Sequence, residues 1–255
     1  MKGFITRLSL LSLAAFCSFK LTASEAEQNP AYADDTIRFL FVTYKPMTYL
    51  ENGEVKGEIA LRAMQTFEGA GFKVELFPNV PFRRVFHMLS TGEPNLCTAG
   101  WFKTPDRLQH AHFTKAINRA DETILITTPD NLEAISRHAS LQTLMQNKEH
   151  RLGLVNGVSS GSGMDDLLEA HQPASIHVQR LEQLFQMLLA DRISYFFAED
   201  TVLIQMKDLN ISPERLSLLK LPGIPKTEDR YIACSKATSA ATMDSLNRVI
   251  SANQE

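Results

Sequence analysis

The chain has 255 residues, of which 44% are hydrophobic and 22% charged, with 26 basic and 29 acidic side chains. This composition is typical of a globular protein with one or two domains and argues against intrinsic disorder. The net charge of −3 provides no basic surface of the kind that attracts nucleic acid or anionic membranes, so neither is expected as a partner.

The first 24 residues have the layout of a secretory signal peptide. They contain three basic residues and no acid, and their apolar run at residues 8–19 is shorter than the about 20 residues of a membrane span. Small residues follow, so cleavage is expected near Ser24 or Ala26. The remaining chain would be exported, without membrane insertion, and would carry 23 basic and 29 acidic residues. A buried N-terminal helix is the alternative interpretation.

Two successive α/β units follow. In the first, strand patterns alternate with helical stripes of apolar residues, the strands at 36–43, 72–76 and 96–100 and the helices at 59–67 and 82–89. In the second, strands are expected at 151–157, 176–179 and 193–198, and helices at 161–171, 181–188 and 201–207. Each unit is expected to be a mostly parallel sheet covered by helices, which makes the fold class α/β.

An extended segment, 122–127, links these units, another strand at 230–236 follows the second unit, and a last helix is expected around 243–250. Two extended segments of this kind are typical of a protein with two lobes joined by a two-strand hinge, in which the chain leaves the first lobe, builds the second and returns. The expected division is a first lobe of residues 25–124 and 230–255, and a second lobe of residues 125–229.

Ligands of open α/β sheets bind beyond the carboxyl ends of the strands. This rule directs attention to the residues after Gly100, after Asn156 and after Ala198. The most suggestive polar residues of the chain lie at these three places.

Three motifs carry a family resemblance, namely Gly-Trp-Phe-Lys-Thr-Pro-Asp-Arg at 100–107, Tyr-Lys-Pro-Met-Thr-Tyr leading to Asn-Gly at 44–53, and Phe-Ala-Glu-Asp at 197–200. Together they resemble the solute-binding proteins of polar amino-acid ABC transporters, the bacterial extracellular solute-binding proteins of family 3, over residues 36–250. The resemblance implies a type 2 periplasmic-binding-protein clamshell and a monomer located in the periplasm. It further implies a small-molecule ligand, an ABC permease or membrane receptor as partner, and no cofactor or metal.

The resemblance also implies roles for individual residues. Arg107 lies where the family holds a ligand carboxylate, and a planar guanidinium suits such a group. Glu199, or Asp200 beside it, would pair with a ligand ammonium, and an acid that stabilises the start of the helix at Thr201 is an equally supported interpretation. The helix N-terminus at 159–162, with Ser159 and Ser160, would offer N–H groups to an anion. The expected walls of the site are Gly100, Trp101, Phe102, Tyr44 and Tyr49, some of which would also serve as core.

Three departures from the family pattern argue against a standard amino-acid ligand. Phe102 replaces a hydroxyl residue that often faces the ligand, Glu58-Ile59 replaces an aromatic residue followed by Asp, and Glu199 replaces Asp.

The chain has three cysteines, and two would remain after processing, Cys97 and Cys234. In an exported protein they can form a disulfide or stay as two buried thiols. The resembled fold inserts the returning strand beside the third strand of the first lobe, which implies that Cys234 lies near Cys97. A lipid anchor at Cys17 is disfavoured because Phe16 precedes it.

Enzyme functions have weaker support in the sequence. Gly-Val-Ser-Ser-Gly at 157–161 matches a nucleophile-elbow pattern, but His171 and His177 are too close in sequence to complete a triad. The seven histidines show no zinc spacing. A dehydratase on the same fold, with Arg107 holding a carboxylate and Glu199 or His112 as acid or base, is the alternative function.

Overall fold

The computed structural model describes residues 35–119, 122–199 and 202–254. The expected signal peptide, its cleavage site, Cys17 and Asp200 lie outside these residues. Within the described part of the chain, none of the helices has the length and apolar character needed to cross a bilayer.

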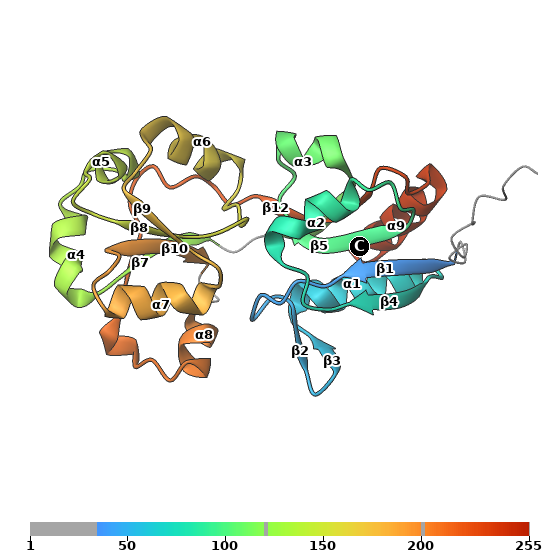
Figure 1. Ribbon diagram of the computed structural model, residues 1–255, viewed down its shortest axis with the longest axis horizontal. Helices are drawn as coiled ribbons and strands as arrows, with labels where there is room; N and C mark the ends of the chain where they lie inside the picture. Colours follow the sequence, from blue (N-terminus) through green and yellow to red (C-terminus); the bar gives the residue numbers. More distant parts are fainter. Residues whose placement is uncertain (1–34, 120–121, 200–201, 255) are drawn as a thin grey trace, which may run out of the picture. The chain divides into compact units, whose positions relative to one another are not determined.

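The first sheet has the strand order β4-β1-β5-β12-β6 (Figure 1). Its strands are β1 (Thr36–Leu40), β4 (Lys73–Phe77), β5 (Leu96–Trp101), β6 (Ala111–Arg119) and β12 (Asp229–Ser235). β1 is parallel to β4 and β5, whereas β12 is antiparallel to both β5 and β6. Four of these strands therefore run in one direction and β12 runs in the other.

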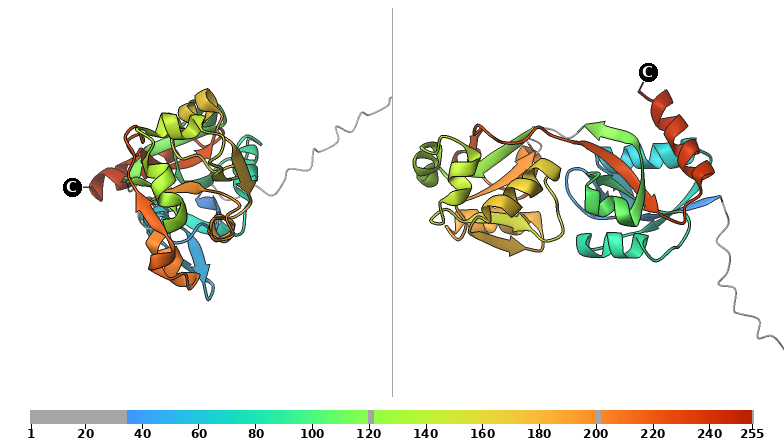
Figure 2. Two further views of the ribbon diagram at one scale, coloured as in Figure 1. Left: turned by 90° about the vertical axis from the view of Figure 1, so that its left-hand side faces the viewer. Right: turned by 90° about the horizontal axis from the view of Figure 1, so that it is seen from above.

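Helices cover both faces of this sheet. β1 alternates between two clusters of apolar residues, with Ile37 and Phe39 in one and Leu40 in the other, because successive side chains of a strand point to opposite faces. α1 (Glu58–Gly69) and the C-terminal helix α9 (Ala240–Ala252) pack on the first face (Figure 2), and α2 (Phe82–Leu89) packs on the second. A hairpin of β2 (Tyr49–Glu51) and β3 (Glu54–Lys56) precedes α1.

The second sheet has the order β11-β7-β10-β8-β9. Its strands are β7 (Thr123–Thr127), β8 (Leu152–Val155), β9 (Ser175–Val178), β10 (Tyr195–Glu199) and β11 (Ser217–Leu219). The helices around it are α4 (Pro129–Ser136), α5 (Leu141–Gln146), α6 (Ser162–His171), α7 (Leu181–Leu189) and α8 (Val202–Asp208), with a 3-10 turn η1 (Pro213–Arg215). Sequence analysis missed α4, α5 and the short edge strand β11.

The two sheets have the same internal plan. In each, three parallel strands are followed by one reversed strand and one edge strand. The reversed strands, β7 and β12, are the segments that were expected to form the hinge. They are integral strands because their backbone groups pair with neighbours on both sides. The chain passes from one sheet to the other between Arg119 and Thr123 and between Leu219 and Asp229.

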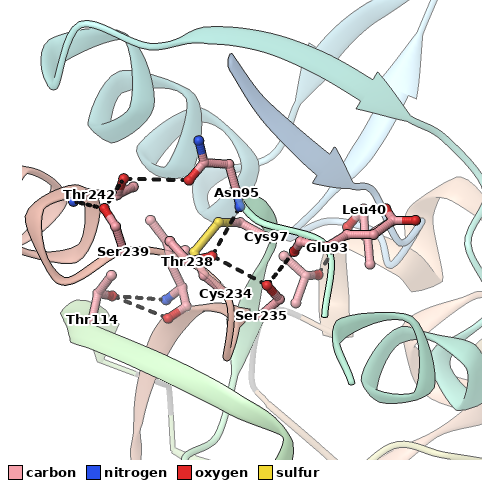
Figure 3. The surroundings of a disulfide bond; sticks show 12 residues. Leu40, Glu93, Asn95, Cys97, Thr114, Cys234, Ser235, Thr238, Ser239 and Thr242 are labelled. Carbon is pink, nitrogen blue, oxygen red and sulfur yellow. Dashed lines mark hydrogen bonds between the residues drawn. A yellow bond between two sulfur atoms is a disulfide. The ribbon is translucent and has the colours of Figure 1, made fainter. Parts of the chain in front are cut away.

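A disulfide bond joins β5 to β12 in the first sheet. Cys97 and Cys234 lie directly opposite each other in this antiparallel pair, fully buried, and their sulfur atoms are bonded (Figure 3). Nearby, the Asn95 N–H donates to the Thr238 hydroxyl at 3.2 Å, and the Ser235 hydroxyl donates to the Glu93 carbonyl (Figure 3). The strand that returns from the second sheet is thus held covalently beside the third strand of the first.

Candidate functional site

A cavity is lined by residues of both sheets, gathered at the carboxyl ends of β1, β5, β8 and β10 and the loops that follow them. Eight of the residues that the sequence suggested for ligand contact line it: Tyr44, Gly100, Trp101, Phe102, Arg107, Ser159, Ser160 and Glu199. Tyr49, on β2, does not. The rule about strand ends therefore led to one place in the structure.

Arg107 lies on the short helix α3 (Pro105–His110), which follows β5 directly. The helix begins here because Thr104 accepts a hydrogen bond from the Arg107 N–H (3.5 Å), and Pro105 occupies the first turn, where its missing N–H costs nothing. This start places the guanidinium beside two aromatic rings that contact each other edge-on, with its central carbon 4.9 Å from the Trp101 ring centroid and 5.2 Å from that of Phe86.

The Arg107 guanidinium is buried but is not neutralised by direct contact. Arg107 is 8% exposed, and its Nη1 donates a hydrogen bond to the Phe102 carbonyl at 3.1 Å. Among the described residues, no carboxylate lies within ion-pair distance of it. Burial lowers the Arg107 pKa to about 10, with Asp165 acting in the opposite direction. The group is therefore charged at neutral pH, in a place where a charge without a partner is costly.

Glu199, at the end of β10, forms an ion pair with Arg230 of β12, and both side chains are largely buried. Arg230 also donates to the Gly100 carbonyl at 2.8 Å, and its guanidinium carbon lies 4.4 Å from the Phe102 ring centroid. Gly100 has a φ of 86°, and a Cβ there would lie 2.9 Å from the Ile59 side chain. Glycine thus allows the turn that presents this carbonyl.

The turn before α6 is occupied by acids of the chain itself. The Ser159 hydroxyl donates to Asp165 and accepts from the Gly161 N–H at 3.0 Å. Glu228 accepts from the Ser162 hydroxyl (3.2 Å) and the Gly163 N–H (3.3 Å). Burial raises the pKa of the Asp165 carboxyl. The negative group that this helix N-terminus favours is therefore already supplied by Glu228.

The aromatic residues both line the cavity and form core. Trp101 and Phe102 are nearly buried, and the Trp101 indole N–H donates to the Thr98 hydroxyl at 2.9 Å. Tyr44 is half-buried, with its ring edge-on to Phe82 at 5.6 Å. Burial raises the Tyr44 pKa to about 12, so its hydroxyl is protonated at neutral pH.

The alternative function, a dehydratase, loses one of the residues proposed as its acid or base. His112 is exposed on β6, and no histidine is found among the described residues that line the cavity. The Ser159 hydroxyl bonds to Asp165 rather than to a histidine base. The described residues also contain no group of three His, Cys, Asp or Glu side chains that could hold a metal ion.

Comparison with known proteins gives a consistent picture. The profile of bacterial extracellular solute-binding proteins, family 3, matches residues 40–254, and the chain belongs to this family. A search of curated proteins gave no match.

Solved structures with the same fold include an ancestral arginine-binding protein bound to arginine (TM-score 0.67, 18% identity, 86% of this chain and 92% of that one). A substrate-binding protein of an ABC uptake transporter from Streptococcus pneumoniae with bound histidine has a TM-score of 0.67 and 18% identity, covering 87% of this chain and 88% of that one. A third is an ancestral amino acid-binding protein described as a precursor of cyclohexadienyl dehydratase (TM-score 0.67, 17% identity, 86% and 89%).

The family and most of these neighbours are therefore binding proteins, not enzymes. The fold is the two-sheet α/β architecture of type 2 periplasmic binding proteins, as the sequence predicted. The family description places its members outside the cytoplasm.

Proposed function

We propose that this protein binds a small carboxylate-bearing solute in the cavity at the strand ends, as the periplasmic partner of an ABC permease or a membrane receptor. The observation that carries the proposal is the buried Arg107 guanidinium, which lines the cavity and has no carboxylate of the described residues within ion-pair distance. A carboxylate would receive charge-assisted hydrogen bonds from it.

The rest of the proposal follows from the family. The N-terminal 24 residues act as an export signal, and the mature chain, from about residue 25, works as a monomer. Residues 25–124 and 230–255 form one lobe, and residues 125–229 form the other. A solute that touches both favours the closed arrangement by its differential affinity.

The test is a thermal-shift screen of the mature protein against amino acids, aliphatic acids and aromatic acids, followed by calorimetry on the best probe. Bound probe raises the melting temperature by mass action and is recovered chemically unchanged. Arg107→Gln should then weaken binding of that probe by at least about 30-fold, since truncating one member of a buried, hydrogen-bonded charge pair costs at least about 2 kcal/mol.

Arg84→Gln is the matched control, because Arg84 is an exposed arginine of the neighbouring helix α2. It should bind like the unmodified protein. Equal affinity in Arg107→Gln and Arg84→Gln would show that Arg107 does not hold the solute.

A further inference from the structure

The charges of the described residues that line the cavity do not balance. Among its described lining residues the charged side chains are Arg107, Arg230 and Glu199, which leaves one excess positive charge. Arg230 and Glu199 neutralise each other in their ion pair. The excess therefore resides on Arg107.

A ligand ammonium would need an anionic acceptor in this cavity, because an unpaired ammonium is costly away from water. Glu199 is the one carboxylate among the described lining residues, and Arg230 already holds it. Arg230 is itself fixed by the Gly100 carbonyl and the Phe102 ring. An ammonium seated at Glu199 would lie beside this guanidinium and would be repelled by it.

The remaining lining is mostly apolar. Aliphatic and aromatic side chains come from the strands of both sheets and from the helices and loops around them, among them Val42, Ile59, Phe82, Val155, Leu181 and Leu184. Such a wall favours an apolar ligand body and leaves few polar groups to solvate a second charge.

Resting on the proposed function, we infer that the solute is an organic monoanion that has a carboxylate, an apolar body and no ammonium group. Its carboxylate pairs with Arg107 and its body lies against the apolar wall. The Arg230–Glu199 pair acts as a specificity element that excludes α-amino acids.

The first experiment measures matched pairs of probes that differ only in the α-ammonium. Calorimetry compares 3-phenylpropanoate with L-phenylalanine and 4-methylpentanoate with L-leucine on the mature protein. The acid without nitrogen should bind at least about tenfold more tightly in at least one pair, a factor that corresponds to about 1.4 kcal/mol. An amino acid that binds as tightly as its partner, or more tightly, would overturn the inference.

Arg230→Gln tests the specificity element directly. This variant releases Glu199 from the guanidinium, so the preference should move by at least about tenfold toward the amino acid. The control is the double variant Arg230→Gln with Glu199→Gln. It removes both charges and keeps two side chains that can form a hydrogen bond with each other. Its affinity for the amino acid should not increase. An unchanged preference in a folded Arg230→Gln protein would refute the role of the pair.

The outcomes separate this inference from the proposed function. An amino acid that binds at least as tightly as its partner acid, and whose binding is lost in Arg107→Gln, would keep the proposed function and reject the inferred ligand class. Absence of binding by every carboxylate probe to the folded protein would reject both. Should Arg230→Gln fail to fold, the double variant and the matched pairs on the unmodified protein still decide the matter.

Discussion

The two arginines of the cavity are buried to the same degree and yet differ in what balances their charge. Arg230, 9% exposed, is paired with Glu199 inside the protein. Arg107, 8% exposed, lies beside the Trp101 and Phe86 rings and donates a hydrogen bond to a backbone carbonyl. A buried charge that the fold satisfies is part of the structure, whereas one that the fold leaves unpaired is available to a ligand. Fold stability and ligand binding should therefore depend on different arginines.

The largest effect is expected from Arg230→Ala. Removing this guanidinium leaves the Glu199 carboxylate buried without its cation, which should lower the free energy of unfolding by about 3–5 kcal/mol. Urea denaturation without added ligand measures it. Arg107→Ala is the comparison. Its loss in the free energy of unfolding should be smaller by at least about 2 kcal/mol, because this substitution removes a desolvated charge and leaves no ion-pair partner behind. Equal losses in the two variants would remove the distinction between the arginines.

A smaller effect is expected from Arg107→Lys. Lysine keeps the positive charge but loses the planar fork that can hold both carboxylate oxygens and that lies against the aromatic rings of Trp101 and Phe86. Affinity for a bound carboxylate probe should fall by about tenfold, or about 1.4 kcal/mol. Calorimetry measures this, and affinity equal to that of the unmodified protein would mean that charge alone holds the anion.

The smallest effect concerns Asp165, which supports the Arg107 charge from a distance, as Glu199 supports Arg230 by contact. Burial raises the pKa of Asp165, so between the unfolded and folded pKa values the native state binds a proton that the unfolded chain lacks. The free energy of unfolding therefore falls as the pH rises through that window.

Asp165→Asn should remove this decline, which melting curves from about pH 3 to about pH 7 can follow. Asp166→Asn, at the exposed neighbouring position, should keep the decline of the unmodified protein. A decline that persists in Asp165→Asn would assign it to another group.

The sequence predicted those parts of the site that lie next to their own strand. Gly100 to Phe102, Arg107 and the Ser159–Ser160 turn lie at or after the ends of strands with clear apolar patterns, and strand ends meet at one edge of a sheet. Arg230 was missed, although an arginine at the start of an otherwise apolar strand was a visible signal. Its role depends on Glu199, 31 residues earlier, and on the insertion of β12 beside β5.

The acids around α6 could not be predicted for a similar reason. Glu228 lies in the segment that returns to the first sheet, 65 residues after the Gly163 N–H to which it bonds. Local patterns correctly indicate that a helix N-terminus favours an anion. They do not say that the anion belongs to the same chain, since that depends on how the returning segment passes the helix.

The disulfide has a consequence for the integrity of the molecule. Cys97 and Cys234 are separated by 137 positions, and the whole of the second sheet lies between them. In the chain-entropy model, closing a loop of this size lowers the conformational entropy of the unfolded chain, which stabilises the folded state by about 5 kcal/mol. A protease that cuts one peptide bond anywhere in that loop leaves two fragments still joined by sulfur. The nicked protein would stay a single covalent species until a reductant separates its pieces.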